Sequence, residues 1–265
     1  MFADSVQPPI VSLFSSTGSN PLSLFSVHTD DALPSDSFVH LLDDATSLPN
    51  PPEPASPISL PQMLSHPNNS EIGHELRQTV LHIQSPTLRT TSICCPPHFV
   101  PLSSSTSRGD LGLRHEWLHM QVRNVGREWS FEVGIVDSAR RLGIIRCSTF
   151  QTSCPTLHLP LAFPAASSNP LTHWADISLH LPSFIPHFSL MSLRHVENNQ
   201  DSEDEDEVET RAQQRVPTSG APVPSGKYSH IAYVRIFATC RLRRIWFSDS
   251  GNKQGLPWEF QLYGQ

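Results

Sequence analysis

The residues with the clearest catalytic spacing are His115, Glu116 and His119, which match the zinc-peptidase pattern His-Glu-x-x-His. That chemistry needs a helix, because a helix brings residues four apart to one face, where both imidazoles can bind one zinc ion. On a strand, the two histidines would lie roughly 13 Å apart and the glutamate would point away. Apolar residues alternate with polar ones here, as in a strand, at Leu118, Met120 and Val122. We therefore predict a strand that binds no zinc.

Other catalytic constellations are weaker still. The run Cys94-Cys95-x-x-His98 lacks metal-site spacing, no Gly-rich phosphate loop precedes a helix, and there is no Gly-x-Ser-x-Gly elbow. The sequence predicts a protein that is not an enzyme and that has no cofactor, metal or small-molecule substrate. A zinc peptidase is kept as the third of three functional hypotheses.

Arginines are the best candidates for binding a partner: Arg140, Arg141, Arg241, Arg243 and Arg244. On strands and turns they could form a basic face that meets an acidic partner. The alternative is that they pair inside the protein with Glu132, Asp137 or Asp249. The sequence alone leaves both interpretations open.

Three of these arginines lie in the stretch from Ser229 to Asp249, which contains two β-type runs. The first run alternates with period two. It is predicted to place Ala232, Val234, Ile236 and Ala238 on one face and Tyr233, Arg235 and Phe237 on the other.

The second run begins with Cys240 and Leu242 inward, so Arg241 and Arg243 should project from the sheet into solvent. Later apolar residues have the opposite parity, which predicts a β-bulge near Arg243 and Arg244.

The rest of the chain contains further short β-type runs, at residues 10–14, 22–27, 79–83, 88–95, 113–122, 129–136, 140–147, 157–163 and 174–181. A dense turn signal between the first two predicts a hairpin. In the run at 129–136 one face is predicted to fill the core, with Trp129, Phe131, Val133 and Ile135. One helical turn is expected at 182–185. About ten short strands with frequent turns predict an all-β fold, an antiparallel β-sandwich.

Two stretches, about 31–67 and 195–227, are predicted to be disordered inserts in a single domain that spans residues 1–265. The first is rich in Pro, Ser and Asp, and we favour a chance apolar patch over a docking motif for its His40-Leu41-Leu42 run. The second contains an acidic run. Ser202 lies in that run and is a candidate phosphorylation site, with an inert spacer as the alternative.

Charge and composition exclude several classes of protein. The net charge is −7, from 25 acidic residues against 18 Lys and Arg. Seven of the acids lie between Asp201 and Glu209, so the remainder is neutral (25 − 7 = 18 acids against 18 bases) and nothing indicates nucleic-acid binding.

No apolar run approaches the roughly 20 residues of a membrane span, and no signal peptide is recognised, so we expect an intracellular protein that does not enter a membrane. The five cysteines do not form a disulfide pattern, which predicts free thiols.

Motifs near both ends of the chain carry a family resemblance. Near the C-terminus, residues 240–249 read Cys-Arg-x-Arg-Arg-x-aromatic-Phe-Ser-Asp and are followed by Glu259-Phe260-x-Leu262-Tyr263. Near the N-terminus, Met1-Phe2 leads to Ser16-x-Gly18-Ser19-x-Pro21-Leu22. In the middle of the chain, Phe131-Glu132-Val133 and then Asp137 form a strand motif. Together these motifs resemble the cilia- and flagella-associated protein twenty family over nearly all of the chain except the two inserts.

The resemblance implies a non-enzymatic, microtubule-associated role at the inner junction of axonemal doublets, supporting the assembly and motility of cilia and flagella. The implied partners are tubulin and other axonemal proteins, with the arginines meeting the acidic surface of tubulin. The implied location is the cytoplasm, the cytoskeleton and the axoneme. The runner-up is a non-ciliary protein-interaction module, with the nucleus as an alternative location, because of the two inserts and the near-neutral ordered part.

Overall fold

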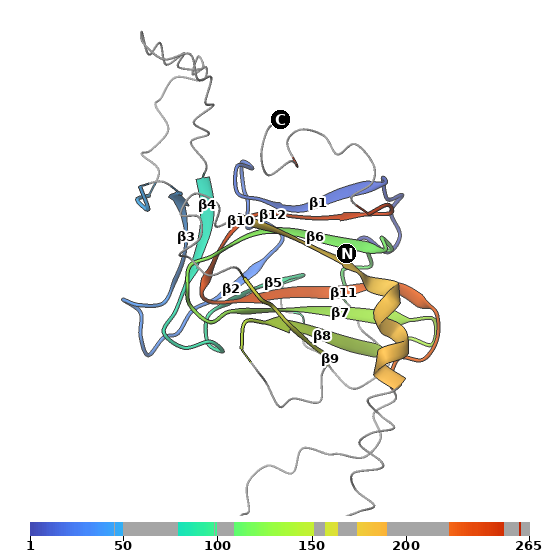
Figure 1. The fold of residues 1–265 in the computed structure, drawn as a ribbon. Helices are drawn as coiled ribbons and strands as arrows, with labels where there is room; N and C mark the ends of the chain where they lie inside the picture. Colours follow the sequence, from blue (N-terminus) through green and yellow to red (C-terminus); the bar gives the residue numbers. More distant parts are fainter. Residues whose placement is uncertain are drawn as a thin grey trace, which may run out of the picture.

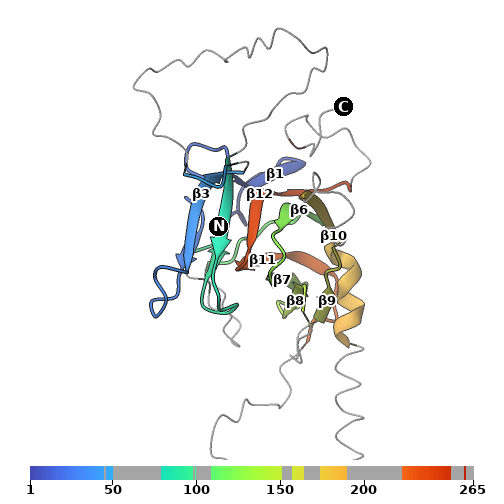
Figure 2. The ribbon, with the colours of Figure 1, turned by 60° about the vertical axis from the view of Figure 1, so that its left-hand side comes forward.

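The computed structural model describes residues 1–44, 46–49, 79–97, 99, 109–150, 157–163, 174–189, 223–251 and 260. In this part of the chain, two six-stranded sheets pack face to face (Figures 1 and 2). The predicted all-β sandwich is therefore confirmed.

The first sheet, sheet A, has the strand order β10-β6-β12-β4-β3, and β1 also pairs with β12. Its strands are β1 (Ile10–Ser15), β3 (Phe38–Asp43), β4 (Thr79–Gln84), β6 (Trp117–Asn124), β10 (Trp174–His180) and β12 (Cys240–Ser248). All its pairings are antiparallel.

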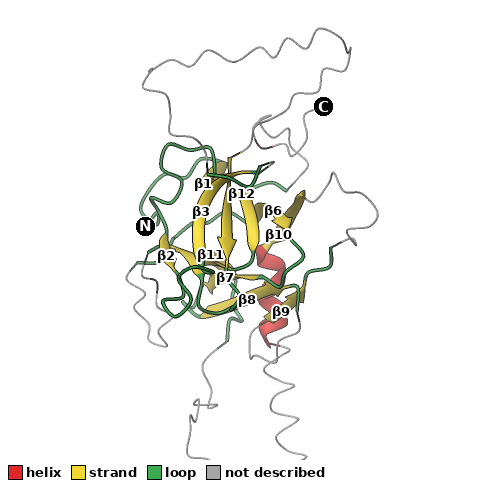
Figure 3. Cartoon of the chain, turned by 90° about the vertical axis from the view of Figure 1, so that its left-hand side faces the viewer, coloured by secondary structure: helices red, strands yellow, loops and turns green. Residues whose placement is uncertain are grey.

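The second sheet, sheet B, has the order β2-β5-β11-β7-β8-β9. Its strands are β2 (Ser26–His28), β5 (Ser92–Cys95), β7 (Ser130–Asp137), β8 (Leu142–Ser148), β9 (Leu157–Pro160) and β11 (Tyr228–Phe237). The β8–β9 pair is parallel, which departs from the antiparallel prediction. A 3-10 helix, η1 (Leu181–Phe184), follows β10 and continues into helical residues 185–189, as the predicted turn at 182–185 anticipates (Figure 3).

Strand β12 is the centre of sheet A, and its two edges pair with different numbers of strands. One side pairs with β6 along its whole length. On the other side, β4 pairs with Cys240 to Leu242 and β1 pairs with the residues from Arg244 onward. The register with β6 shifts between Leu242 and Arg244, which confirms the predicted bulge.

The core lies between the sheets. The residues of the 129–136 run that were predicted to be inward are all fully buried there, namely Trp129, directly before β7, and Phe131, Val133 and Ile135 within it. In β11 the prediction is wrong at Ala232, because the register shifts between Ile231 and Tyr233. Ile231 fills the main core, whereas Ala232 and Tyr233 form a second cluster with Cys94 and Val136.

The predicted hairpin at 10–14 and 22–27 is wrong, because β1 lies in sheet A and β2 in sheet B. The connection makes its own turns, with the N–H of Gly18 bonded to the carbonyl of Ser15 and that of Phe25 to that of Leu22. The rings of Phe14 and Phe25 meet edge to face at 5.9 Å in the core, so the chain crosses from one sheet to the other there.

The first predicted insert begins too early. Strand β3 lies inside it, paired with β4 from Phe38 to Asp43, so the His40-Leu41-Leu42 run is part of a strand and not a chance patch. Val39 and Leu41 pack against the core from one face of this strand, although the sequence around it is rich in Pro and Ser. Residues 50–67 of this segment lie outside the described residues.

Of the second predicted insert, residues 195–222, including Ser202, also lie outside the described residues, whereas 223–227 pack on the sandwich and Pro224 is buried. The four described cysteines are free and buried, as predicted: Cys94, Cys95, Cys147 and Cys240.

Candidate functional site

The His-Glu-x-x-His motif is extended and not helical. Strand β6 begins at Trp117, so His119 lies on the strand, as predicted, while His115 and Glu116 precede it. Both nitrogens of His119 are 2.9 Å from hydroxyl oxygens, those of Ser178 and Ser248. The Nε2 atom of His115 instead lies 2.7 Å from the carbonyl of Pro8. Each histidine thus has its own structural partners, and within the described residues no group of His, Cys, Asp and Glu could hold a metal ion.

His119 is part of the packing on the outer face of sheet A. Burial lowers its pKa to about 4, so the ring is neutral at physiological pH. It stacks with Trp246 at 5.0 Å and with Trp117 at 6.2 Å between ring centroids. The motif therefore stabilises the sheet.

Arg241 lies on the outer face of sheet A in a straight row of cross-strand neighbours. The row runs over five strands, from β10 to β3, through Trp174, Arg123, Arg241, His82 and His40. The face was predicted correctly, but the exposure was not, since Arg241 is only 9% exposed. A loop after β3 covers it.

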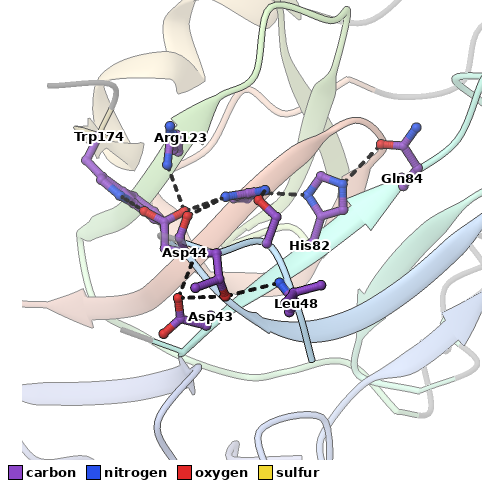
Figure 4. A network of polar contacts seen from close by, with 10 residues as sticks. Asp43, Asp44, Leu48, His82, Gln84, Arg123 and Trp174 are labelled. Atoms are coloured by element: carbon purple, nitrogen blue, oxygen red, sulfur yellow. Dashed lines mark hydrogen bonds and ion pairs between the residues drawn. The ribbon is translucent and has the colours of Figure 1, made fainter. Parts of the chain in front are cut away.

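Asp44, on that loop, binds the middle of this row (Figure 4). Its Oδ1 accepts hydrogen bonds from Arg241 Nη1 at 2.7 Å and from Arg123 Nη1 at 2.9 Å. Its Oδ2 accepts one from Trp174 Nε1 at 2.9 Å. Arg241 also donates to the carbonyl of Asp44 at 3.0 Å and to Ser47 Oγ at 2.6 Å. Internal pairing, the alternative interpretation of the arginines, therefore holds for Arg241, although its partner is a residue that the sequence did not suggest.

The charges of this cluster fix the protonation states of its members. Burial raises the pKa of Asp44, but hydrogen bonds from Arg241 and Trp174 and the charge of Arg123 outweigh it and lower the pKa below 3.8. The Nε of Arg241 donates to Nδ1 of His82 at 3.3 Å, so His82 is neutral and directs its Nε2–H to Gln84 at 3.0 Å. Burial, and then the nearby Arg241 charge, lower the pKa of His82.

Arg243 and Arg244 are half-buried beside the bulge of β12. The guanidinium of Arg244 lies over the ring of Phe260, 4.8 Å from its centroid, and Gln121 donates to the Phe260 carbonyl at 2.8 Å. Burial raises the pKa of Asp176, and the charge of Arg243 acts against that rise. Both arginines therefore interact with the chain itself.

Arg140 and Arg141 lie elsewhere, in the turn between β7 and β8. Arg140 is exposed and has a positive φ of 60°. Arg141 donates to Ser225 Oγ at 2.6 Å and to the carbonyl of Val223 at 3.2 Å. The five arginines thus occupy three separate places and do not form one basic face.

Asp137 organises the β7–β8 turn and is 1% exposed. Its Oδ1 accepts the backbone N–H groups of Ala139 and Arg141, at 2.9 and 2.8 Å. Its Oδ2 accepts those of Ser225 and Gly226, each at 3.1 Å. Burial raises the pKa of Asp137, but these four bonds outweigh it and lower the pKa below 3.8. The sequence singled out Asp137 only as part of a motif and as an ion-pair partner.

The other two suggested acids, Glu132 and Asp249, lie beside other basic side chains. Glu132 pairs with Arg146, its cross-strand neighbour on β8. Asp249 is exposed, and its nearest ionic neighbour is His115 at 4.0 Å. Sequence reasoning missed Arg123, Asp44 and Trp174, because only the pairing of the strands brings them together.

The sequence of residues 68–197 matches the CFA20 domain. Cilia- and flagella-associated protein 20 of Chlamydomonas reinhardtii is 23% identical to this chain over 190 residues, which cover 71% of this chain and 76% of that protein. Over these residues the chain resembles the CFA20 domain family, with distant homology to Cilia- and flagella-associated protein 20. The proteins of the same name from Caenorhabditis briggsae and Caenorhabditis elegans are also 23% identical over 190 residues, 71% of this chain and 71% of each protein. The predicted resemblance to this family is thereby confirmed.

No helix in the described ranges has both the length and the apolar character needed to span a bilayer.

Proposed function

We propose that this chain is a non-enzymatic structural protein of cilia or flagella that binds axonemal microtubules at the inner junction of the doublet. The observation that carries the proposal is its similarity to Cilia- and flagella-associated protein 20 over 190 residues. The names of the relatives associate those proteins with cilia and flagella, and we extend that association to this chain.

The outer faces of the sandwich support a binding role. Each sheet carries a row of charged and polar side chains across its strands, with Arg123 and Arg241 in sheet A. In sheet B the corresponding row contains Arg235, Glu132 and Arg146. In sheet B, where the side chain of Arg146 is partly exposed, side chains fixed by neighbouring strands present a rigid surface to a protein partner without reorganisation. In sheet A the loop of Asp44 covers Arg241.

We propose that the β7–β8 turn is one contact with the acidic surface of tubulin. Arg140 is exposed there, and Lys227 is exposed beside it; the N–H of Ser138 donates to the Lys227 carbonyl, and the N–H of Lys227 donates to Ser138 Oγ. Arg141 is proposed to support the β7–β8 turn, and Arg243 and Arg244 the part of β12 that follows Arg241, because their own contacts already hold them.

The test is to localise a tagged full-length chain in ciliated cells and to sediment the purified protein with microtubules. We expect axonemal signal and co-sedimentation that weakens as salt screens the charges. The double variant Arg140→Gln, Lys227→Gln should sediment less, whereas Arg127→Gln, an exposed arginine on the β6–β7 connection, should behave as the native protein. Diffuse or nuclear signal without microtubule binding would favour the non-ciliary interaction module.

A further inference from the structure

Two like charges face each other on sheet A. Arg123 on β6 and Arg241 on β12 are direct cross-strand partners, with no residue between them. Like charges in directly opposed positions destabilise a sheet. The pair therefore requires an anion from outside the two strands.

The donors around this position converge on one carboxylate. Two guanidinium groups reach Asp44 Oδ1 at 2.7 and 2.9 Å, and the indole N–H of Trp174 reaches Oδ2 at 2.9 Å. The three donors come from three neighbouring strands, β10, β6 and β12. His82 also holds Arg241 from the other side, and Gln84 holds His82, so part of the site is positioned without Asp44.

The loop that supplies Asp44 closes on itself. Asp43 binds Thr46 through its side chain and pairs with Leu48 and Ser47 through its backbone. Residues 46–49 are exposed, and Asp44 and Ser47 bond this loop to the row through side-chain contacts with Arg241. The side chain of Asp44 can therefore leave the row without unfolding the turn.

The site also reaches solvent. The side chain of Arg123 is 28% exposed and that of Asp44 is 15% exposed. A carboxylate on an outside chain can approach along this open side, and arginine pairs bind carboxylates through charge-assisted hydrogen bonds.

We propose that Arg123, Arg241 and Trp174 form a carboxylate-binding site that Asp44 fills from within the chain and that an acidic segment of a partner protein fills in its place. The proposal rests on the proposed function only in expecting an acidic partner. Asp44 then acts as an internal competitor, so that binding at this face requires a partner dense enough in Asp and Glu to displace it.

The test uses the full chain and a labelled octaglutamate peptide, without microtubules. Asp44→Ala should bind the peptide about tenfold more tightly than the native protein. The gain should vanish in Asp44→Ala, Arg123→Gln but persist in Asp44→Ala, Arg127→Gln. Acetate, compared with chloride at equal ionic strength, should raise the melting temperature of Asp44→Ala and not that of the native protein.

Equal peptide affinity of the native protein and Asp44→Ala would overturn the proposal, as would a gain that survives loss of Arg123. If the alanine variant does not fold, Asp44→Asn keeps the shape of the side chain and must still bind the peptide more tightly than the native protein. Because no arm contains microtubules, this site can fail while microtubule binding stands, and the reverse also holds.

Discussion

Two aspartates, Asp44 and Asp137, each hold a loop of the sandwich in place, and they accept hydrogen bonds from different kinds of donor. Asp44, shortly before residues 50–78, is held by side chains, two of them cationic. Asp137 holds Ser225 and Gly226, shortly after residues 190–222, and its four donors are backbone N–H groups. One attachment is an ion cluster at a partly open face, and the other is a buried carboxylate without a cation.

The difference decides which attachment can be exchanged. Backbone N–H groups around Asp137 belong to the turn itself, so removing the carboxylate leaves them unpaired in a buried place. The guanidinium groups around Asp44 can accept another anion in its place. Asp137 is therefore a fixed part of the fold, whereas Asp44 is a replaceable ligand.

The largest expected effect is that of Asp137→Asn. The amide keeps one acceptor oxygen, but its NH₂ group faces backbone donors and leaves them unpaired. We expect a loss of about 2 to 4 kcal/mol in the free energy of unfolding, measured by urea denaturation. Asp249→Asn, at an exposed aspartate, is the control and should change stability little. A loss of less than about 0.5 kcal/mol, the usual size for surface changes, would contradict the role of Asp137.

Asp44→Asn should cost less, about 1 to 2 kcal/mol, because the site is partly open and water can hydrate the two guanidinium groups. The same urea experiment measures it. Adding Arg123→Gln to Asp44→Asn should recover part of the loss, since it removes one of the two opposed charges. A purely additive double variant would show that the two residues are not coupled.

Acid should separate the two attachments. The pKa of folded His82 lies below its ordinary value of 6.5, so the unfolded chain binds more protons as pH falls below 6.5, and stability around Asp44 is lost in that range. The pKa of Asp137 lies below 3.8, so its contribution is present above that pH and is lost only as pH falls further. Hydrogen exchange, corrected for intrinsic rates, should therefore speed up at Ser47 and Leu48 between pH 6.5 and 4.5 before it does so at Ser225 and Gly226. His82→Gln should abolish the early change, and a simultaneous onset at both sites would refute this explanation.

Salt should give the smallest difference. At about 1 M NaCl the Debye length is about 3 Å, so the ion cluster at Asp44 should weaken by a few tenths of a kcal/mol. The neutral donors at Asp137 should be insensitive. A double-mutant cycle between Asp44 and Arg123, measured at low and high salt, isolates the effect. A coupling energy that stays constant with salt would remove the distinction between the two attachments.

The local patterns predicted the strands but not their neighbours. The period of two identified the core face of β7, because Trp129, Phe131, Val133 and Ile135 alternate without interruption. The bulge of β12 was also predictable, since it leaves a parity change in the sequence. The bulge of β11 was not, because small Ala232 fits either face.

The arginine contacts depend on strand pairing, and the sequence does not give that pairing. Arg123, Arg241 and Trp174 are far apart in the chain and meet only because β6 lies between β10 and β12. Asp44 lies in a segment whose Pro, Ser and Asp content predicted disorder. The outward direction of Arg241 followed from alternation, but its burial depended on a loop that composition alone could not position.

The central place of β12 has a consequence for synthesis of the protein. It is the last strand in the described part of the chain, yet it joins β6 to β4 and β1, and Ile10 pairs with Ser248 across most of the sequence. The earlier strands of sheet A therefore leave the ribosome before β12, and the edges that pair with β12 stay open until it has been made. During that interval the nascent chain exposes β edges that invite aggregation, and a chaperone that shields them would act before β12 has left the ribosome.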